Sequence, residues 1–364
     1  MNASERELDY CFADQVPEPG AALPVAPGIV WARMPLPFAL DHVNVWLLED
    51  ACAGQKRWTL VDCGIDDAPT RGHWETLFDD TLDGAPVQRV LCTHSHPDHF
   101  GLAHWLCAGG ARERWQARLW MTLGEYATGR LLSTTDAGSG AGGHDAAEHM
   151  RRHGFADAVV LDQIAHRKTY YPGLVPKVPM RFRRMLGGDL IDINGQTWRV
   201  IIGYGHSPEH AALHCAALNV LIAGDMVLPR ISTNVSVFDV EPESDPLGGF
   251  LDSLDRYEDL PADTLVLPSH GKPFRGLHVR LRQLRAHHAA RLDEVRRACA
   301  ERPHSAADIL PVMFRRPLDA HQLTFALGEA LAHLHFLWHR GELERVEEND
   351  VYRFRPVLRA GRPG

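Results

Sequence analysis

Short apolar runs alternate with longer amphipathic segments along most of this 364-residue chain. Runs rich in β-branched and large apolar residues predict strands, whereas apolar positions that recur every three or four residues predict helices. Strands are expected near residues 28–34, 43–49, 58–63, 88–93, 117–121, 189–193, 197–203, 211–217, 220–224 and 264–268. Helices are expected near residues 70–80, 100–109, 122–132, 145–153, 247–259 and 277–300. This alternation favours the α/β class.

The pattern changes near residue 300 and predicts a small separate domain over 301–364. Ser305 is placed to cap a helix, residues 318–340 indicate one or two more helices, and Gly341 stops the last one. A polar turn at 347–350 between two apolar runs predicts a hairpin. The segment holds nine Arg against nine Asp plus Glu, and this balance argues against binding of nucleic acid.

The strongest candidate for chemistry directly follows the apolar run at 90–93. Residues 94–99 read His-Ser-His-Pro-Asp-His, so four side chains able to bind a metal fall within six positions. In an extended segment residues two apart point to the same side, so His94 and His96 can hold one cation. Asp98 and His99 then face a second position. Although the chain has 22 histidines, a chance cluster would not supply this full string.

Three later residues of the same chemical kind stand at the ends of short apolar runs. These residues are His206, Asp225 and His270, and each lies next to a glycine. Open α/β sheets place their sites at the carboxyl ends of strands, so the three are expected near the first cluster. Imidazole and carboxylate ligands together suit zinc or another hydrolytic metal pair.

These motifs resemble those of the metallo-β-lactamase superfamily. The resemblance is carried by Thr-His-Ser-His-Pro-Asp-His at 93–99, Gly-His-Ser-Pro-Glu-His at 205–210, Ala-Gly-Asp at 223–225 and Ser-His-Gly at 269–271. It implies a four-layer αβ/βα sandwich over residues 1–300, with a helical and basic insertion at about 122–187. The helices and hairpin of 301–364 resemble the small winged-helix domain of one branch of this superfamily, which includes ribonuclease and glyoxalase II-like thioesterase relatives.

The resemblance also implies a role for each ligand candidate. It assigns His94, His96 and His206 to one metal, assigns Asp98, His99 and His270 to the other, and makes Asp225 the bridge. Asp62, in the Val-Asp-Cys-Gly turn at 61–64, is implied to support the metal loop. Two divalent ions, zinc first with manganese or iron as alternatives, would hold a hydroxide between them. Asp98 would also orient this nucleophile and pass a proton to the leaving group.

A basic segment between Asp162 and Asp189 is the candidate for substrate binding. Its cations include Arg167, Lys168, Arg181, Arg183 and Arg184, and it contains no acidic residue. It could cover the site and attract an anionic small-molecule substrate, and the alternative is a solvated loop. Tyr204 is a candidate oxyanion donor because it lies two residues before His206, and the alternative is core packing.

Composition limits the compartment and the partners. The net charge of −9 opposes a polyanion-binding protein, and no apolar run is long enough to span a membrane. The seven cysteines are scattered and lack any Cys-x-x-Cys, which favours reduced thiols in the cytoplasm. A homo-oligomer through the C-terminal domain is an open alternative.

We therefore expect a metal-dependent hydrolase that acts on a thioester or activated ester of an anionic acyl carrier. Phosphodiester hydrolysis, including ribonuclease action, is the second expectation, and lactone or lactam opening is the third. The secreted β-lactamases carry Cys where Asp225 stands, which disfavours the lactam reading. An iron-dependent oxidoreductase of the same fold is the alternative outside the hydrolases.

Overall fold

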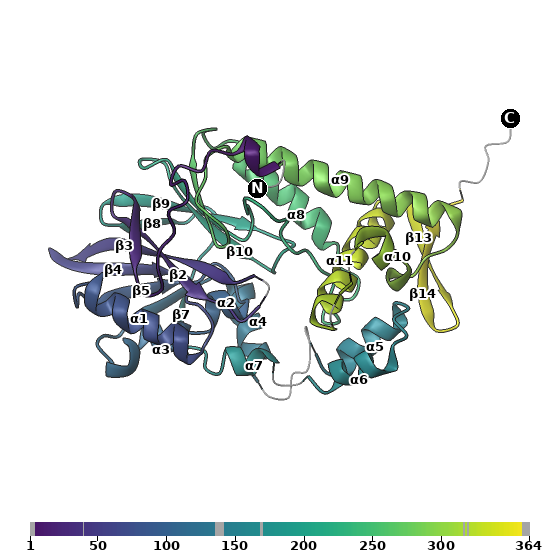
Figure 1. The fold of residues 1–364 in the computed structure, drawn as a ribbon, viewed down its shortest axis with the longest axis horizontal. Coiled ribbons are helices and arrows are strands. Elements are labelled where there is room, and N and C mark those ends of the chain that lie inside the picture. The colour runs from purple at the N-terminus through teal and green to yellow at the C-terminus, as the bar shows by residue number, and fades with distance from the viewer. Residues whose placement is uncertain are drawn as a thin grey trace. The chain divides into compact units, whose positions relative to one another are not determined.

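The chain folds into two compact units in a computed structural model that describes residues 4–38, 40–134, 142–167, 170–315, 317–318 and 320–358. The first unit comprises Met1–Thr134, Tyr171–Thr233 and Ser253–Arg282. The second comprises Thr135–Tyr170, Asn234–Asp252 and Gln283–Gly364. Each unit is described by itself below, and the elements are labelled in Figure 1.

Two sheets form the frame of the first unit (Figure 1). The larger sheet contains, in spatial order, β1 (Ala22–Ala26), β2 (Ile29–Pro35), β3 (His42–Cys52), β4 (Gln55–Val61), β5 (Val87–Leu91), β6 (Arg118–Met121) and β7 (Phe182–Arg184). The smaller sheet contains β12 (Leu265–Pro268), β11 (Val220–Gly224), β10 (His210–Cys215), β9 (Gln196–Gly203) and β8 (Leu190–Ile193). Neighbours from β4 to β7 are parallel, as are β11 and β12. Parallel strands of this kind are usually buried on both faces.

Alternation along β3 shows how the large sheet separates two cores. Val45 and Leu47 lie in the core on the helical side, whereas Trp46 and Leu48 lie in the core shared with the second sheet. Both faces of the strand are therefore buried, and the sequence is apolar at every position from 45 to 48. The core on the second-sheet side also receives Trp198 of β9, so the two sheets pack face to face.

Helices cover the outer face of the large sheet and connect its strands. They are α1 (Ala68–Asp80), α2 (Pro97–Phe100), α3 (Ala103–Cys107), α4 (Leu123–Leu132) and α7 (Tyr170–Leu174). Asp67 caps α1 by accepting a hydrogen bond from the Thr70 nitrogen at 2.8 Å. Trp74 and Phe78 of α1 are fully buried in the core on this side. A mixed α/β sandwich of sheets and helices is thus confirmed.

The second unit is mainly helical and ends in a hairpin. Its elements are α5 (His144–Arg152), α6 (Ala158–Ala165), α10 (Ala306–Met313), α11 (Ala320–His339), β13 (Leu343–Glu348) and β14 (Val351–Pro356), together with most of α8 (Pro246–Leu254) and α9 (Leu277–Glu301). Ser305 and Asp308 form a capping box at the start of α10. Asn349 and Asp350 both have positive φ, at 54° and 62°, as a tight hairpin turn requires. The predicted C-terminal helices and hairpin are present, while their winged-helix classification stays a prediction.

Several predicted elements need correction. The single helix expected at 100–109 is two short helices, α2 and α3, because the chain turns at Gly101 and Leu102. The strands β1 and β7 and the helices α6 and α7 were not predicted from the sequence. The strand β7 reads Phe-Arg-Arg, which is too short and too polar to show a period of two. Within the described residues, no helix is long and apolar enough to cross a membrane.

Candidate metal centre

The seven predicted ligands lie together at the carboxyl ends of strands in the first unit. The segment after β5 supplies His94, His96, Asp98 and His99, and the last two sit on α2, which begins at Pro97. The segments after β9, β11 and β12 supply His206, Asp225 and His270. These residues form three overlapping groups whose donor atoms lie within 4.8 Å of one another. Their role as ligands stays a prediction, but the structure brings them together.

The first group joins His94, His96 and His206. The Nε2 atom of His94 is 2.9 Å from Nδ1 of His96 and 3.2 Å from Nε2 of His206. In a tetrahedral zinc site with bonds of about 2.0–2.1 Å, donor atoms lie about 3.3 Å apart. Burial is the main reason that the pKa of His96 falls to about 3 and that of His94 falls well below its usual value. Both rings are therefore neutral, which is the form that binds a metal.

The second group joins Asp98, His99 and His270. The Oδ2 atom of Asp98 is 3.3 Å from Nε2 of His99 and 3.4 Å from Nε2 of His270. Burial opposes protonation of His270, but nearby carboxylates outweigh it and raise its pKa to about 10. Burial would raise the pKa of Asp98, yet His99 and His270 lower it well below its usual range. The raised pKa of His270 reflects the negative potential of the Asp225 and Asp98 carboxylates, which suits a bound cation.

Asp225 lies between the two groups. Its Oδ2 is 3.3 Å from Nε2 of His206, and its Oδ1 is 3.4 Å from Nε2 of His270. The buried Oδ1 of Asp225 and the buried Nε2 of His99 have no hydrogen-bond partner among the described residues. Unsatisfied polar atoms are rare in protein interiors. Both atoms face the group of Asp98, His99 and His270, so a metal ion bound there would satisfy both, and the residues fit a metal site.

Asp62 holds the metal loop, as the resemblance implied. Its carboxylate accepts a hydrogen bond from the Thr93 nitrogen at 2.8 Å, and its Oδ2 lies 2.8 Å from Nδ1 of His99. This contact leaves Nε2 of His99 facing the other ligand candidates. The Nδ1 atom of His270 makes a comparable contact of 2.8 Å with the carbonyl oxygen of His42.

Glu125 and His210 support the site, although no role was predicted for either from the sequence. Glu125 of α4 is fully buried, and its carboxylate accepts hydrogen bonds from Ser95 and from the Glu209 nitrogen. His210 is also buried, and its Nε2 accepts a hydrogen bond from the Asp225 nitrogen at 3.1 Å. Only glycine fits at 224, because a Cβ there would collide with the His210 ring. His210 already stood in the quoted motif, whereas no local signal marks Glu125.

The predicted substrate-binding residues are not gathered in this cluster. Tyr204 is 40% exposed, and its ring stacks against the Arg256 guanidinium at 4.8 Å. Arg181, Arg183 and Arg184 are all exposed, and the Arg183 guanidinium also stacks on Trp120 of β6 at 4.1 Å. Arg167 belongs to the second unit and lies 6.0 Å from the Tyr170 ring. Lys168 lies outside the described residues.

Comparisons with known proteins agree with the motif and the fold. A model described as the metallo-beta-lactamase superfamily matches residues 39–270, and one described as the metallo-beta-lactamase-like C-terminal domain matches residues 292–357. A probable metallo-hydrolase of Bacillus subtilis (strain 168) is 22% identical over 352 residues, which cover 91% of this chain and 98% of that protein.

Two crystal structures are also similar to this chain. A beta-lactamase domain protein from Burkholderia ambifaria is 59% identical with a TM-score of 0.92, and the match covers 98% of this chain and 100% of that one. A metallo-beta-lactamase family protein from Thermus thermophilus is 28% identical with a TM-score of 0.72, and the match covers 91% of this chain and 99% of that one.

Proposed function

This chain belongs to the metallo-β-lactamase superfamily and is a metallo-hydrolase, and from that premise we propose that it hydrolyses a thioester or activated ester of an anionic acyl carrier at a site for two divalent metal ions. Zinc is the proposed metal, because three imidazoles on one side and a mixed imidazole and carboxylate set on the other suit it. Manganese and iron are the alternatives that metal analysis would reveal.

The observation that carries the proposal is the position of Asp225. One carboxylate oxygen lies 3.3 Å from His206 in the first group, and the other lies 3.4 Å from His270 in the second. A carboxylate placed in this way can join two metal sites through its two oxygens. Two adjacent divalent ions lower the pKa of a water held between them to about 7 and stabilise the oxyanion that develops on an attacked carbonyl.

Asp98 is the proposed catalytic residue. Its side chain is 17% exposed, whereas those of His99 and His270 are 0% and 3% exposed, so a substrate can reach Asp98 more easily. Its Oδ2 faces the two imidazoles, and the second oxygen of the same carboxylate can accept a hydrogen bond from the attacking water. The carboxylate is then positioned to pass a proton to the leaving thiol or alcohol.

The anionic substrate is proposed from the basic residues around β7. Arg181 and Arg184 are exposed, and the described residues supply no carboxylate within 4.0 Å of either. Unpaired surface cations in an otherwise acidic protein attract anions over about 8–10 Å at physiological ionic strength. All seven cysteines are free thiols, which supports the further proposal that the enzyme works in the reducing cytoplasm.

A hydrolysis panel on protein of known metal content tests the substrate class. The panel contains an acyl-coenzyme A, S-lactoylglutathione, a homoserine lactone, a bis-aryl phosphodiester and single-stranded RNA. We expect the highest kcat/KM with a thioester, and we expect that activity to fall about 10²–10⁴-fold in an Asp98→Asn variant purified in the same way. Highest turnover of the phosphodiester or RNA would replace this proposal with phosphodiesterase action. Highest turnover of the lactone would replace it with lactonase action.

A further inference from the structure

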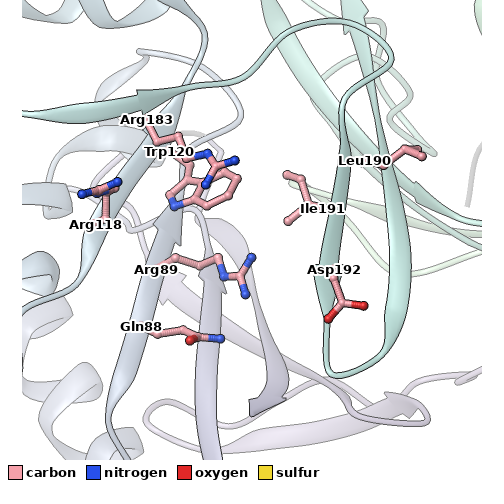
Figure 2. A pocket seen from close by; sticks show the side chains of 8 residues that line it. All are labelled: Gln88, Arg89, Arg118, Trp120, Arg183, Leu190, Ile191 and Asp192. Atoms are coloured by element: carbon pink, nitrogen blue, oxygen red, sulfur yellow. The ribbon is translucent and has the colours of Figure 1, made fainter. Parts of the chain in front are cut away.

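A hollow of about 440 Å³ opens on the first unit (Figure 2). It lies between β5, β6 and β7 of the large sheet on one side and β8 of the small sheet on the other. Its lining residues are Gln88, Arg89, Arg118, Trp120, Arg183, Leu190, Ile191 and Asp192. None of them belongs to the candidate metal groups, so this is a separate feature of the fold.

The strand register places three arginines on one face of the sheet. Arg89 of β5 pairs with Arg118 of β6, and Trp120 of β6 pairs with Arg183 of β7. Paired residues of parallel neighbours point to the same side, as do residues two apart in one strand. Figure 2 shows the resulting arrangement, with Arg89, Arg118 and Arg183 around the Trp120 indole.

The positive charge of this face is only partly neutralised. Arg89 is paired with Asp50 at 2.9 Å, but no carboxylate of the described residues lies within 4.0 Å of Arg118 or Arg183. The charges of Arg118 and Arg183 are therefore left for a bound anion to neutralise.

Trp120 holds two of the three arginines, Arg89 and Arg183, in place before any ligand arrives. The Arg183 guanidinium lies 4.1 Å from its ring centroid, and the Arg89 guanidinium lies 5.3 Å from it. Such stacking fixes the direction of the guanidinium donors at low entropic cost. Because guanidinium groups already lie against the indole, the ring positions the arginines and does not offer a platform for a nucleobase.

Two further polar groups indicate which kind of ligand fits. The Nε2 atom of Gln88 is buried and has no hydrogen-bond partner among the described residues, so it is a donor that lacks an acceptor. The Asp192 carboxylate already accepts a hydrogen bond from the Gly195 nitrogen at 3.3 Å. The hollow thus presents mostly donors, which suits a ligand that carries only acceptors.

We propose that this hollow is a binding site for a phosphate-type anion, such as pyrophosphate or the phosphate chain of a nucleotide. Planar guanidinium groups bind phosphate oxygens through two parallel hydrogen bonds, and the three arginines provide the required positive charge. None of the lining residues is a candidate metal ligand, and Arg89 lies within β5 whereas His94 follows the end of that strand. The anion would therefore bind at a second site, and the inference does not depend on the proposed hydrolase substrate.

Titration calorimetry with pyrophosphate and ATP on the metal-loaded protein tests this site. We expect both to bind, with an affinity that falls at least tenfold in an Arg118→Gln variant and in an Arg183→Gln variant. Arg112→Gln is the matched control, because Arg112 is an exposed cation of the first unit that does not line the hollow. This control is expected to bind as the wild type does. Metal content is measured before and after titration, so that removal of metal by the ligand is not counted as binding.

The outcomes separate the proposal from binding elsewhere. Equal binding by pyrophosphate and ATP supports recognition of the phosphate group alone, as does weakening of both by potassium chloride. Binding that is unchanged in the Arg118 and Arg183 variants would place the anion elsewhere, for example at the metals, and would overturn the proposal. Absence of binding to the wild type at millimolar ligand, or binding of ATP without pyrophosphate, would overturn it as well.

Discussion

Glu125 holds Ser95 by two hydrogen bonds to a single carboxylate oxygen. Its Oε2 accepts from the Ser95 nitrogen at 2.8 Å and from the Ser95 hydroxyl at 2.7 Å. Its other oxygen, Oε1, accepts from the Glu209 nitrogen at 2.8 Å. Ser95 stands between two predicted ligands, and Glu209 follows His206 by three residues. One buried carboxylate thus fixes the spacing of two ligand segments that are distant in sequence.

Replacement of Glu125 by Gln is expected to weaken metal binding. The amide keeps one acceptor oxygen but turns an NH₂ donor toward an N–H group, so at least one ligand segment loses its anchor. Loss of comparable supporting contacts in metal sites lowers affinity by about 10–100-fold. Competition with a chromophoric zinc chelator measures this affinity, and turnover is measured at saturating metal. Glu113→Gln is the control because Glu113 is an exposed glutamate of the same unit that is not a candidate ligand. Wild-type metal affinity and turnover in the Glu125 variant would contradict the positioning role.

Asp98→Asn is expected to reduce turnover far more than stability. An amide oxygen can still face the metals, but the side chain no longer accepts a proton at neutral pH. Loss of a positioned acid or base typically lowers the rate by about 10²–10⁴-fold. kcat and the melting temperature are compared with those of the wild type at equal metal content. A variant with unchanged kcat would remove Asp98 from the mechanism.

The number of metal ions can be tested by single-ligand variants. The wild type is expected to hold about two divalent ions per chain, because the donor atoms form one group around His96 and another around His270. His96→Ala and His270→Ala should each retain about one ion, since each removes a donor from only one group. Elemental analysis after equilibration with excess zinc gives the count. If the wild type binds no more than one ion per chain, the two-metal site is rejected, even if hydrolysis is observed.

The strands and the ligand candidates could be predicted because both have local signals. The runs before His94, Asp225 and His270 are buried and apolar, so composition alone marked them as strands. Glu125 could not be predicted in this way. Its partners come from segments 30 and 84 residues away, and a buried glutamate on a helix has the same local sequence as an exposed one.

The basic segment shows that the positions of charged residues in the sequence do not reveal which way their side chains point in the fold. The segment containing Arg183 was expected to face the metals, yet β7 is part of the large sheet and follows its register. Arg183 pairs with Trp120 and turns to the face with the hollow, while its neighbour Arg184 does not line it. The three-residue strand gave no periodic signal, so the alternation of its two arginines became visible only in the fold.

Buried histidines of the second unit are expected to make its stability fall in acid. His335 of α11 is fully buried, and its Nδ1 lies 2.9 Å from the Ser244 carbonyl oxygen. Burial is the main reason that its pKa falls to about 4. Between pH 4 and 6.5 the unfolded chain binds a proton at this histidine and the folded chain does not. The contribution of His335 to stability is therefore present above pH 6.5 and is lost as the pH falls toward 4.

His335→Asn removes this titration while keeping the local hydrogen bond. The Asn amide can donate to the Ser244 carbonyl in place of Nδ1, and the buried Nε2 of His335 has no partner among the described residues to lose. The smaller side chain leaves a cavity whose cost is the same at every pH. Between pH 7.5 and 5.0 the wild type should therefore lose about 2 kcal/mol more free energy of unfolding than the variant. Urea unfolding at both pH values, followed by a probe in the second unit, measures the difference. The variant His166→Asn, at an exposed histidine, serves as the control, and its free energy of unfolding should change with pH as that of the wild type does. If the free energy of unfolding of His335→Asn also changes by the same amount as that of the wild type, His335 does not determine the acid sensitivity.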